Sequence, residues 1–299
     1  MSRPIASHEL ELLATGSWIL GTGGGGSPYS SYLSMKNFYN DGGSVELLDA
    51  EELADDDLVA VLSTMGAPLV FQERMTDPAL ALRPLRIMED YLGKRFRAVM
   101  TVEIGGCNAF QPLLAAAASG LPVVDADAMG RAFPEAQMQT FAIADLAMYP
   151  HVVADIRDND VIVARAATWQ SLERVRRKVC TEFGSVATTC QAPRTGAEIK
   201  RHAILRTTSR AIELGCNVNR YPTLPGPNWT PIAPSPLVQI SMGVPSAVRS
   251  PRLEADLRER RRDVGSYADS GRSTTAYYAN AAPNPKLISF VAFPYQSEN

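Results

Sequence analysis

The sequence predicts an α/β fold with a mixed, mostly parallel sheet, and two observations carry this prediction. Apolar runs of strand length alternate with helix-length segments through the first 165 residues. Polar residues and glycines end two of these runs, as they do at the ligand-binding rim of parallel sheets. The chain has 299 residues, 45% of them hydrophobic, which suits one large domain or two ordinary ones.

Residues 1–165 are predicted to form the first domain. Leu58–Met65 is a mostly apolar run, typical of a strand that is covered on both faces. Periodicity and turn residues place the remaining elements. The other predicted strands are 45–48, 96–104 and 121–124, and the predicted helices are 8–20, Pro28 to about Gly42, 78–92 and 111–119.

After Pro150 the pattern changes. Two short apolar runs around a polar turn predict an antiparallel hairpin at residues 152–165. Helices are expected over 171–183, after a cap at Thr195, and up to Gly215. We therefore expect an incomplete α+β second domain at 166–216. Residues 217–299 are expected to be an irregular tail, because residues 217–236 alone hold six prolines.

Composition excludes several classes of protein. A net charge of −3 gives no basic excess for nucleic acid. No apolar run approaches the ~20 residues of a membrane span, and the first residues lack a signal core, so we expect a cytoplasmic protein. The 4 cysteines lack C-x-x-C spacing, and the 3 histidines, His8, His151 and His202, form no H-x-x-x-H pair. A homo-oligomer is left open.

A glycine-rich loop follows the first predicted helix. Five of the six residues 21–26 are glycine, and Ser27-Pro28 opens the next helix. Such a turn can present backbone N–H groups to an anion or a carbonyl oxygen. It matches neither a Walker A loop nor a dinucleotide-binding fingerprint. We expect ligand contacts from the loop, and the alternative is a flexible connector. The expected contacts are Gly23, Gly24, Gly25, Gly26 and Ser27.

A carboxylate ends the predicted strand at 96–104, in the run Glu103-Ile-Gly-Gly-Cys107-Asn108. Burying a carboxylate there is costly unless it is paired, hydrated or metal-bound. Asn108 either caps the following helix or orients a ligand. Cys107 is best explained as a small residue at a crowded helix start.

Two further carboxylates follow the next predicted strand, at Asp125 and Asp127. Residues two apart on an extended segment point the same way. Their charges would repel, so either one is protonated or both share a cation. Arg131 either neutralises this cluster or clamps a substrate oxygen, and Glu135 lies eight residues beyond Asp127.

Together these three motifs resemble one family, formerly a domain of unknown function numbered 917 and now named after S-methyl thiohydantoin desulfurase. The resemblance covers about residues 7–215. It implies a metal-dependent hydrolase whose namesake replaces the methylthio group of a thiohydantoin by water, giving a hydantoin and methanethiol. It also implies association with hydantoinase/oxoprolinase-type proteins. The family pattern Pro-Gly-Thr-x-Ser is not kept here, because Leu205 and Arg206 replace its first two residues.

On this resemblance we expect a divalent metal, with zinc as one candidate. Glu103, Asp125 and Asp127 would be its ligands, and Glu135 or Asp127 the catalytic base. The glycine loop, Asn108 and Arg131 would bind a cyclic amide or thiohydantoin. The alternatives are a non-catalytic partner of a hydantoinase/oxoprolinase and an inactive, truncated remnant.

Overall fold

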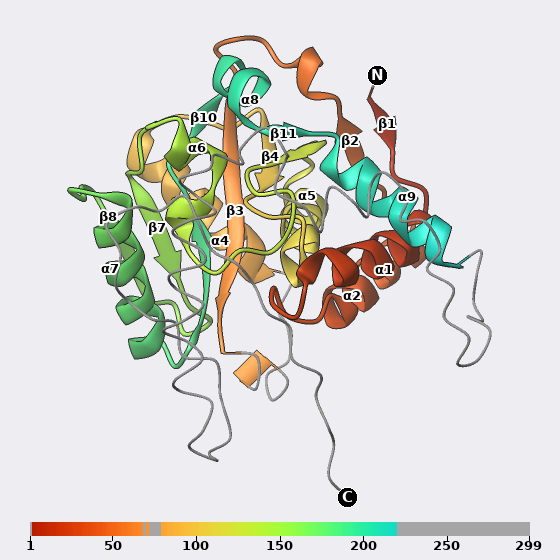
Figure 1. Ribbon diagram of the computed structural model, residues 1–299, viewed down its shortest axis with the longest axis horizontal. Helices are drawn as coiled ribbons and strands as arrows, with labels where there is room; N and C mark the ends of the chain where they lie inside the picture. The colour runs from red at the N-terminus through yellow and green to blue at the C-terminus, as the bar shows by residue number, and fades with distance from the viewer. Residues whose placement is uncertain (1, 68–69, 72–78, 220–299) are drawn as a thin grey trace, which may run out of the picture. The chain divides into compact units, whose positions relative to one another are not determined.

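The computed structural model describes residues 2–67, 70–71 and 79–219, and there the predicted mixed α/β fold is confirmed (Figure 1). Its centre is a sheet with the strand order β1-β2-β5-β4-β3-β9-β7-β8, and β10 also pairs with β3. The strands are β1 (Arg3–Pro4), β2 (Glu46–Leu48), β3 (Leu58–Gly66), β4 (Ala98–Thr101), β5 (Val123–Val124), β7 (His151–Ala154), β8 (Asp160–Val163), β9 (Val186–Cys190) and β10 (Arg194–Thr195). A separate two-stranded ladder joins β6 (Ala126–Asp127) to β11 (Ile204–Leu205).

The sheet is parallel in one half and antiparallel in the other. Strands β2, β5, β4 and β3 run parallel, and β3 is in register with β4 from Val59↔Ala98 onward. On its other side β3 pairs antiparallel with β9, which pairs antiparallel with β7. The predicted hairpin is confirmed as β7–β8, with Val152 opposite Ile162.

Helices cover both faces of the sheet. Thr188 donates a hydrogen bond to the carbonyl of Leu80 in α4, whereas its neighbour Ala187 packs with Cys180 of α7. Because successive strand residues point to opposite faces, α4 and α7 lie on opposite sides. The helices are α1 (Glu9–Gly21), α2 (Tyr29–Asn40), α4 (Ala79–Leu92), α5 (Gln111–Ser119), α6 (Thr140–Ile143), α7 (Trp169–Glu182), α8 (Gly196–His202) and α9 (Thr207–Asn219), with short 3-10 turns η1 (Ala50–Glu52), η2 (Gly106–Phe110) and η3 (Ala136–Met138).

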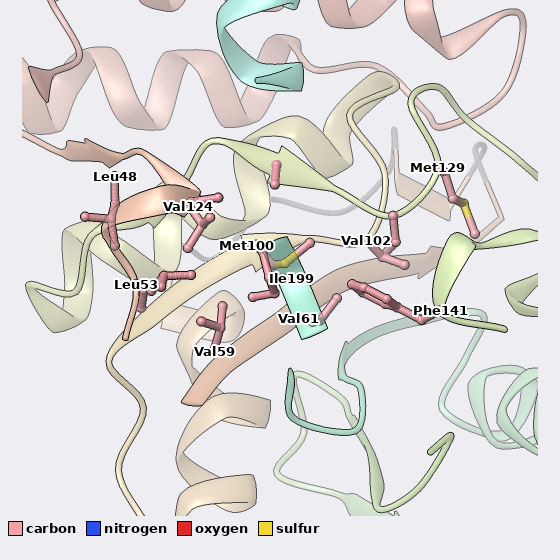
Figure 2. Packing of buried hydrophobic residues seen from close by; sticks show 14 residues of the cluster. Leu48, Leu53, Val59, Val61, Met100, Val102, Val124, Met129, Phe141 and Ile199 are labelled. Atoms are coloured by element: carbon pink, nitrogen blue, oxygen red, sulfur yellow. The ribbon is translucent and has the colours of Figure 1, made fainter. Parts of the chain in front are cut away.

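One apolar cluster lies between the sheet and the helices α6 and α8 (Figure 2). Val59 and Val61 of β3 and Met100 of β4 contribute from the sheet, and all three are fully buried. Phe141 and Ile199 close the cluster from α6 and α8. This packing fixes the carboxyl ends of β4 and β5, from which the polar motifs emerge.

The segment expected to form a second domain contributes strands to the same sheet. Strand β9, which the sequence pattern did not predict, lies between β3 and β7. Helix α9 continues to Asn219 instead of stopping at Gly215. The rest of the predicted irregular tail, 220–299, lies outside the described residues. In the described ranges, no helix has the length and apolar character needed to cross a membrane.

Candidate functional site

Glu103 and Asn108 meet just beyond the end of β4. The Thr101 hydroxyl donates to the carbonyls of Glu103 and Asn108, at 2.8 Å each, which folds the chain back on itself. The Asn108 side chain then donates to Glu103 Oε1 at 2.7 Å. Its own oxygen accepts from the backbone N–H of Thr64 in β3, at 2.7 Å. Asn108 therefore orients Glu103 and does not cap the following helix, whose N-cap is Phe110.

The Glu103 carboxylate is buried but well supported. Glu103 is 7% exposed, and its Oε2 accepts a hydrogen bond from the backbone N–H of Phe133 at 2.9 Å. Burial raises the pKa of Glu103, while the Asn108 and Phe133 hydrogen bonds oppose this rise.

Asp127 is a second buried carboxyl next to Glu103. It is fully buried in β6, and it accepts from the N–H of Ile104 at 2.8 Å and from that of Gly130. Burial, with the charge of Glu103 as a smaller contribution, raises the pKa of Asp127 to about 7. Asp127 thus ties together the two loops that follow β4 and β6.

Asp125 faces a different part of the molecule. It lies between β5 and β6, where its side chain accepts from the N–H of Ser209 at 3.1 Å and from its hydroxyl at 2.5 Å. Asp125 lines a cavity of about 320 Å³ together with Arg3, Leu47, Asp49, Arg206 and Ser209. Arg206 itself has a φ of 62°, a left-handed conformation that suits the glycine of the family pattern better than an arginine.

The glycine-rich loop packs against the turn after Glu103. The carbonyl of Gly25 accepts from Cys107 N at 2.8 Å, and Gly106 has a φ of 67°. A Cβ on Gly106 would lie 2.2 Å from the Gly25 oxygen, so the two backbones can approach only because this residue is glycine. Burial raises the pKa of the Cys107 thiol to about 12, which keeps it protonated and poorly nucleophilic. The loop is therefore part of the wall beside Glu103.

Arg131 and Glu135 lie on the segment that covers Glu103. The guanidinium of Arg131 is 3.9 Å from the centre of the Phe133 ring, whose backbone binds Glu103, and burial lowers the pKa of Arg131. The Glu135 side chain accepts from Gln137 on its own segment. Of the sequence-predicted residues, Glu103, Asn108 and Asp127 are thus brought together, with Arg131 and the glycine loop close by.

The three predicted metal ligands do not converge. Asp125 binds Ser209, Asp127 binds backbone N–H groups, and Glu103 binds Asn108. Throughout residues 2–67, 70–71 and 79–219, no three His, Cys, Asp or Glu side chains are grouped so that they could hold a metal ion. The arrangement does not fit the predicted metal centre. Metal binding stays a prediction, which elemental mass spectrometry of the purified protein would test.

Several buried polar side chains were not predicted from the sequence. His151, Gln139, Gln191 and Trp169 are all buried, and each has a polar atom without a hydrogen-bond partner in the described part of the chain. A polar residue at the head of the apolar run Val152-Val153-Ala154 was the one signal that could have singled out His151.

Two family models cover most of this architecture. The S-Me-THD-like N-terminal domain matches residues 8–165, and the S-Me-THD-like C-terminal domain matches residues 167–224. The chain belongs to the S-Me-THD-like family. No curated protein matches it.

A solved structure shares the fold of this S-Me-THD-like protein. It is the crystal structure of a protein from Chromobacterium violaceum, with 25% sequence identity and a TM-score of 0.65. The match covers 75% of the present chain and 64% of the Chromobacterium protein. The present chain therefore spans less than two thirds of that protein's length.

Proposed function

We propose that this S-Me-THD-like protein is a hydrolase that replaces a thio substituent on a five-membered cyclic amide-type ring by water. The family name supports the reaction class. The observation that carries the proposal is the pair of buried carboxyls, Glu103 and Asp127, beside the carboxyl ends of parallel strands. Burial raises the pKa of both carboxyls, that of Asp127 to about 7, and carboxyls whose pKa values are shifted by their surroundings are suited to acid–base catalysis.

Glu103 is the better candidate for contact with the substrate. It is 7% exposed, whereas Asp127 is fully buried and bound by backbone N–H groups. In the proposed reaction Glu103 accepts a proton from water while the water oxygen attacks the ring carbon that bears the methylthio group. The C=N electrons of that carbon move to the ring nitrogen, and the water oxygen stays on the carbon as a hydroxyl. The carbon–sulfur bond then breaks, methanethiolate takes up the proton held by Glu103, and the hydroxyl proton passes to the ring nitrogen, which leaves a ring C=O and N–H. Asp127 acts as a positioning residue that sets the charge and placement of Glu103.

Substitution of Glu103 by glutamine tests this assignment. We expect turnover of an S-methylated thiohydantoin to fall by about 100-fold or more, because glutamine cannot accept the proton. Both Glu103 oxygens accept hydrogen bonds, from Asn108 and from Phe133 N, and the glutamine amide can replace only one of these acceptors. We therefore expect a lower thermal unfolding midpoint, and turnover is compared at a temperature at which circular dichroism shows both proteins to be folded. Glu135→Gln is the matched control and should keep near wild-type turnover. Full activity of Glu103→Gln, or loss only in the control, would overturn the assignment.

A second candidate function is a partner of a hydantoinase/oxoprolinase-type protein. Its support is a set of exposed apolar side chains on α1 and α2, beside the glycine-rich loop, including Trp18 and Tyr29 at about 60% exposure. The double substitution Trp18→Ala/Tyr29→Ala should abolish co-purification with such a partner and leave turnover unchanged. Retained co-purification would remove this candidate.

A further inference from the structure

The segment 133–136 connects Glu103 to helix α7. Its first residue, Phe133, donates its backbone N–H to Glu103 Oε2 at 2.9 Å. Its last residue, Ala136, donates its backbone N–H to Glu173 Oε2 of α7 at 3.1 Å. Glu173 thereby satisfies a backbone donor at the start of η3, whose own N-cap residue makes no side-chain capping bond. Both ends of the segment are therefore bound by carboxylates, one in the candidate site and one in α7.

Arg177 of α7 binds the middle of the same segment. Its Nη2 donates to the Pro134 carbonyl, and its Nε donates to Glu173 Oε1. Proline has no backbone N–H, so its carbonyl is the backbone group by which a side chain can hold it. A guanidinium presents several donors in a fixed geometry and can make both contacts at once. Glu173 and Arg177 thus act as a pair, because each binds the segment and each binds the other.

The Glu173 carboxylate is buried and fully paired. It is 4% exposed, and Arg176 lies against it with Nη2 at 2.5 Å and Nε at 2.6 Å from Oε2. Burial alone would raise the pKa of Glu173, but the charges of Arg176 and Arg177 and the hydrogen bond from Ala136 bring it below its ordinary value. Glu173 is therefore ionised at neutral pH and fixed in place.

The charge of the same network reaches Glu103. Burial raises the pKa of Glu103, and the charge of Arg176 is one of the contributions that oppose this rise. Asp127 and Cys107 also face Glu103. Burial raises the pKa of each, and the charge of Glu103 raises it further. Of these three neighbours Arg176 is the cation, so α7 influences both the position and the charge of Glu103.

We propose that Glu173 and Arg177 are positioning residues that hold the backbone N–H of Phe133 against Glu103. Both belong to the residues matched by the C-terminal family model, whereas Glu103 and Phe133 belong to those matched by the N-terminal one. The second family domain thus supports a site that the first domain builds. The catalytic consequence rests on the proposed function, while the hydrogen bond itself can be measured without turnover.

Amide hydrogen exchange, followed by NMR on the full chain, tests whether Phe133 is held in this way. We expect its amide to exchange about tenfold faster or more in Arg177→Met, because the freed segment lets this N–H leave Glu103 and reach water. The Arg177 side chain is 53% exposed and methionine keeps an apolar stem, so the variant should fold. Arg174→Met alters an exposed arginine of the same helix and is the matched control. The amides of β3 should exchange as in the wild type in both variants.

Turnover gives a second measurement. Glu173→Gln keeps an acceptor for the N–H of Ala136 but loses the charge that binds Arg177. We expect Glu173→Gln and Arg177→Met to lower kcat for an S-methylated thiohydantoin by about tenfold with little change in KM, because only the placement of Glu103 is altered. A purely stabilising network would lower the unfolding midpoint and leave kcat unchanged in the folded protein.

Three results would overturn the assignment. They are wild-type exchange of Phe133 in Arg177→Met, equally accelerated exchange of Phe133 and the β3 amides, and faster Phe133 exchange in a variant that keeps the wild-type kcat. Should Glu173→Gln fail to fold, Arg177→Met decides. Selectively faster exchange of Phe133, in a protein whose wild type does not hydrolyse thiohydantoins, would support the positioning and reject the proposed function alone.

Discussion

The buried carboxyl of Asp127 makes the stability of the site depend on pH. Its pKa rises from an ordinary value of 3.8 to about 7 on folding. Between these values the folded protein holds a proton that the unfolded chain has lost. The contribution of Asp127 to the free energy of unfolding is therefore greatest at low pH, and it falls as pH rises towards about 7.

Asp127→Asn should remove this part of the pH dependence. Asparagine has a similar shape and does not titrate, so the variant's free energy of unfolding should fall less steeply between about pH 4 and pH 7. Urea unfolding at several pH values measures the difference. If the free energy of unfolding changes with pH in the same way in the variant and in the wild type, Asp127 does not hold its proton in the folded state.

The observed positions of individual residues show which parts of the site can be predicted from sequence patterns. Glu103, Asn108 and Asp127 were predicted to share a site, and their contacts bring them together. Asp125 was expected to point the same way as Asp127, but it lies at the break between β5 and β6 and turns towards Ser209. The alternation rule applies only within one continuous strand. Where a strand breaks is set by tertiary pairing, here with β11, which periodicity does not reveal.

Among the elements, α8 begins at Thr195, the cap that the sequence predicted. The Thr195 hydroxyl accepts from Glu198 N at 3.2 Å, and the Glu198 side chain accepts from Thr195 N at 2.9 Å. This reciprocal capping box satisfies backbone donors that the helix itself leaves unpaired. Local chemistry alone produces such a start, which is why it could be predicted.

Replacing Thr195 by alanine should cost about 0.5–2 kcal/mol of stability. For a folded region of this size, the unfolding midpoint should fall by about 2–4 °C per kcal/mol. Thr181→Ala is the control, because its hydroxyl bonds the Arg177 carbonyl within α7 and should matter little. Equal midpoints for both variants in differential scanning calorimetry would contradict the capping role.

Strand β9 is the most important element that the sequence pattern did not predict, because it joins β3 to β7. Its sequence, Val-Ala-Thr-Thr-Cys, is buried on both faces and so lacks an alternating pattern. The two threonines satisfy their hydroxyls through Leu80 and Ser63, contacts that form only in the folded protein. Nothing local distinguishes such a strand from a polar connector.

For the whole molecule, the position of β9 makes residues 1–165 dependent on the chain beyond them. The β7–β8 hairpin joins the sheet only through β9, among the strands that the structure describes, and β9 also covers one side of β3. We therefore expect a 1–165 fragment to lack cooperative unfolding, whereas the full chain shows it. Near-ultraviolet circular dichroism during urea unfolding would distinguish them. A sharp transition in the fragment would mean that the first family domain folds by itself.

The contact between α1 and α9 has a consequence for how the protein is made. Gly16 of α1 lies against Ala211, and Gly215 of α9 lies against Leu12, so closely that a Cβ at either glycine would be about 2 Å from a backbone oxygen. The first helix thus finds its partner only after about 200 further residues have been added, which at roughly 5–20 residues per second takes tens of seconds. During that interval the face of α1 that later packs against α9 has no partner.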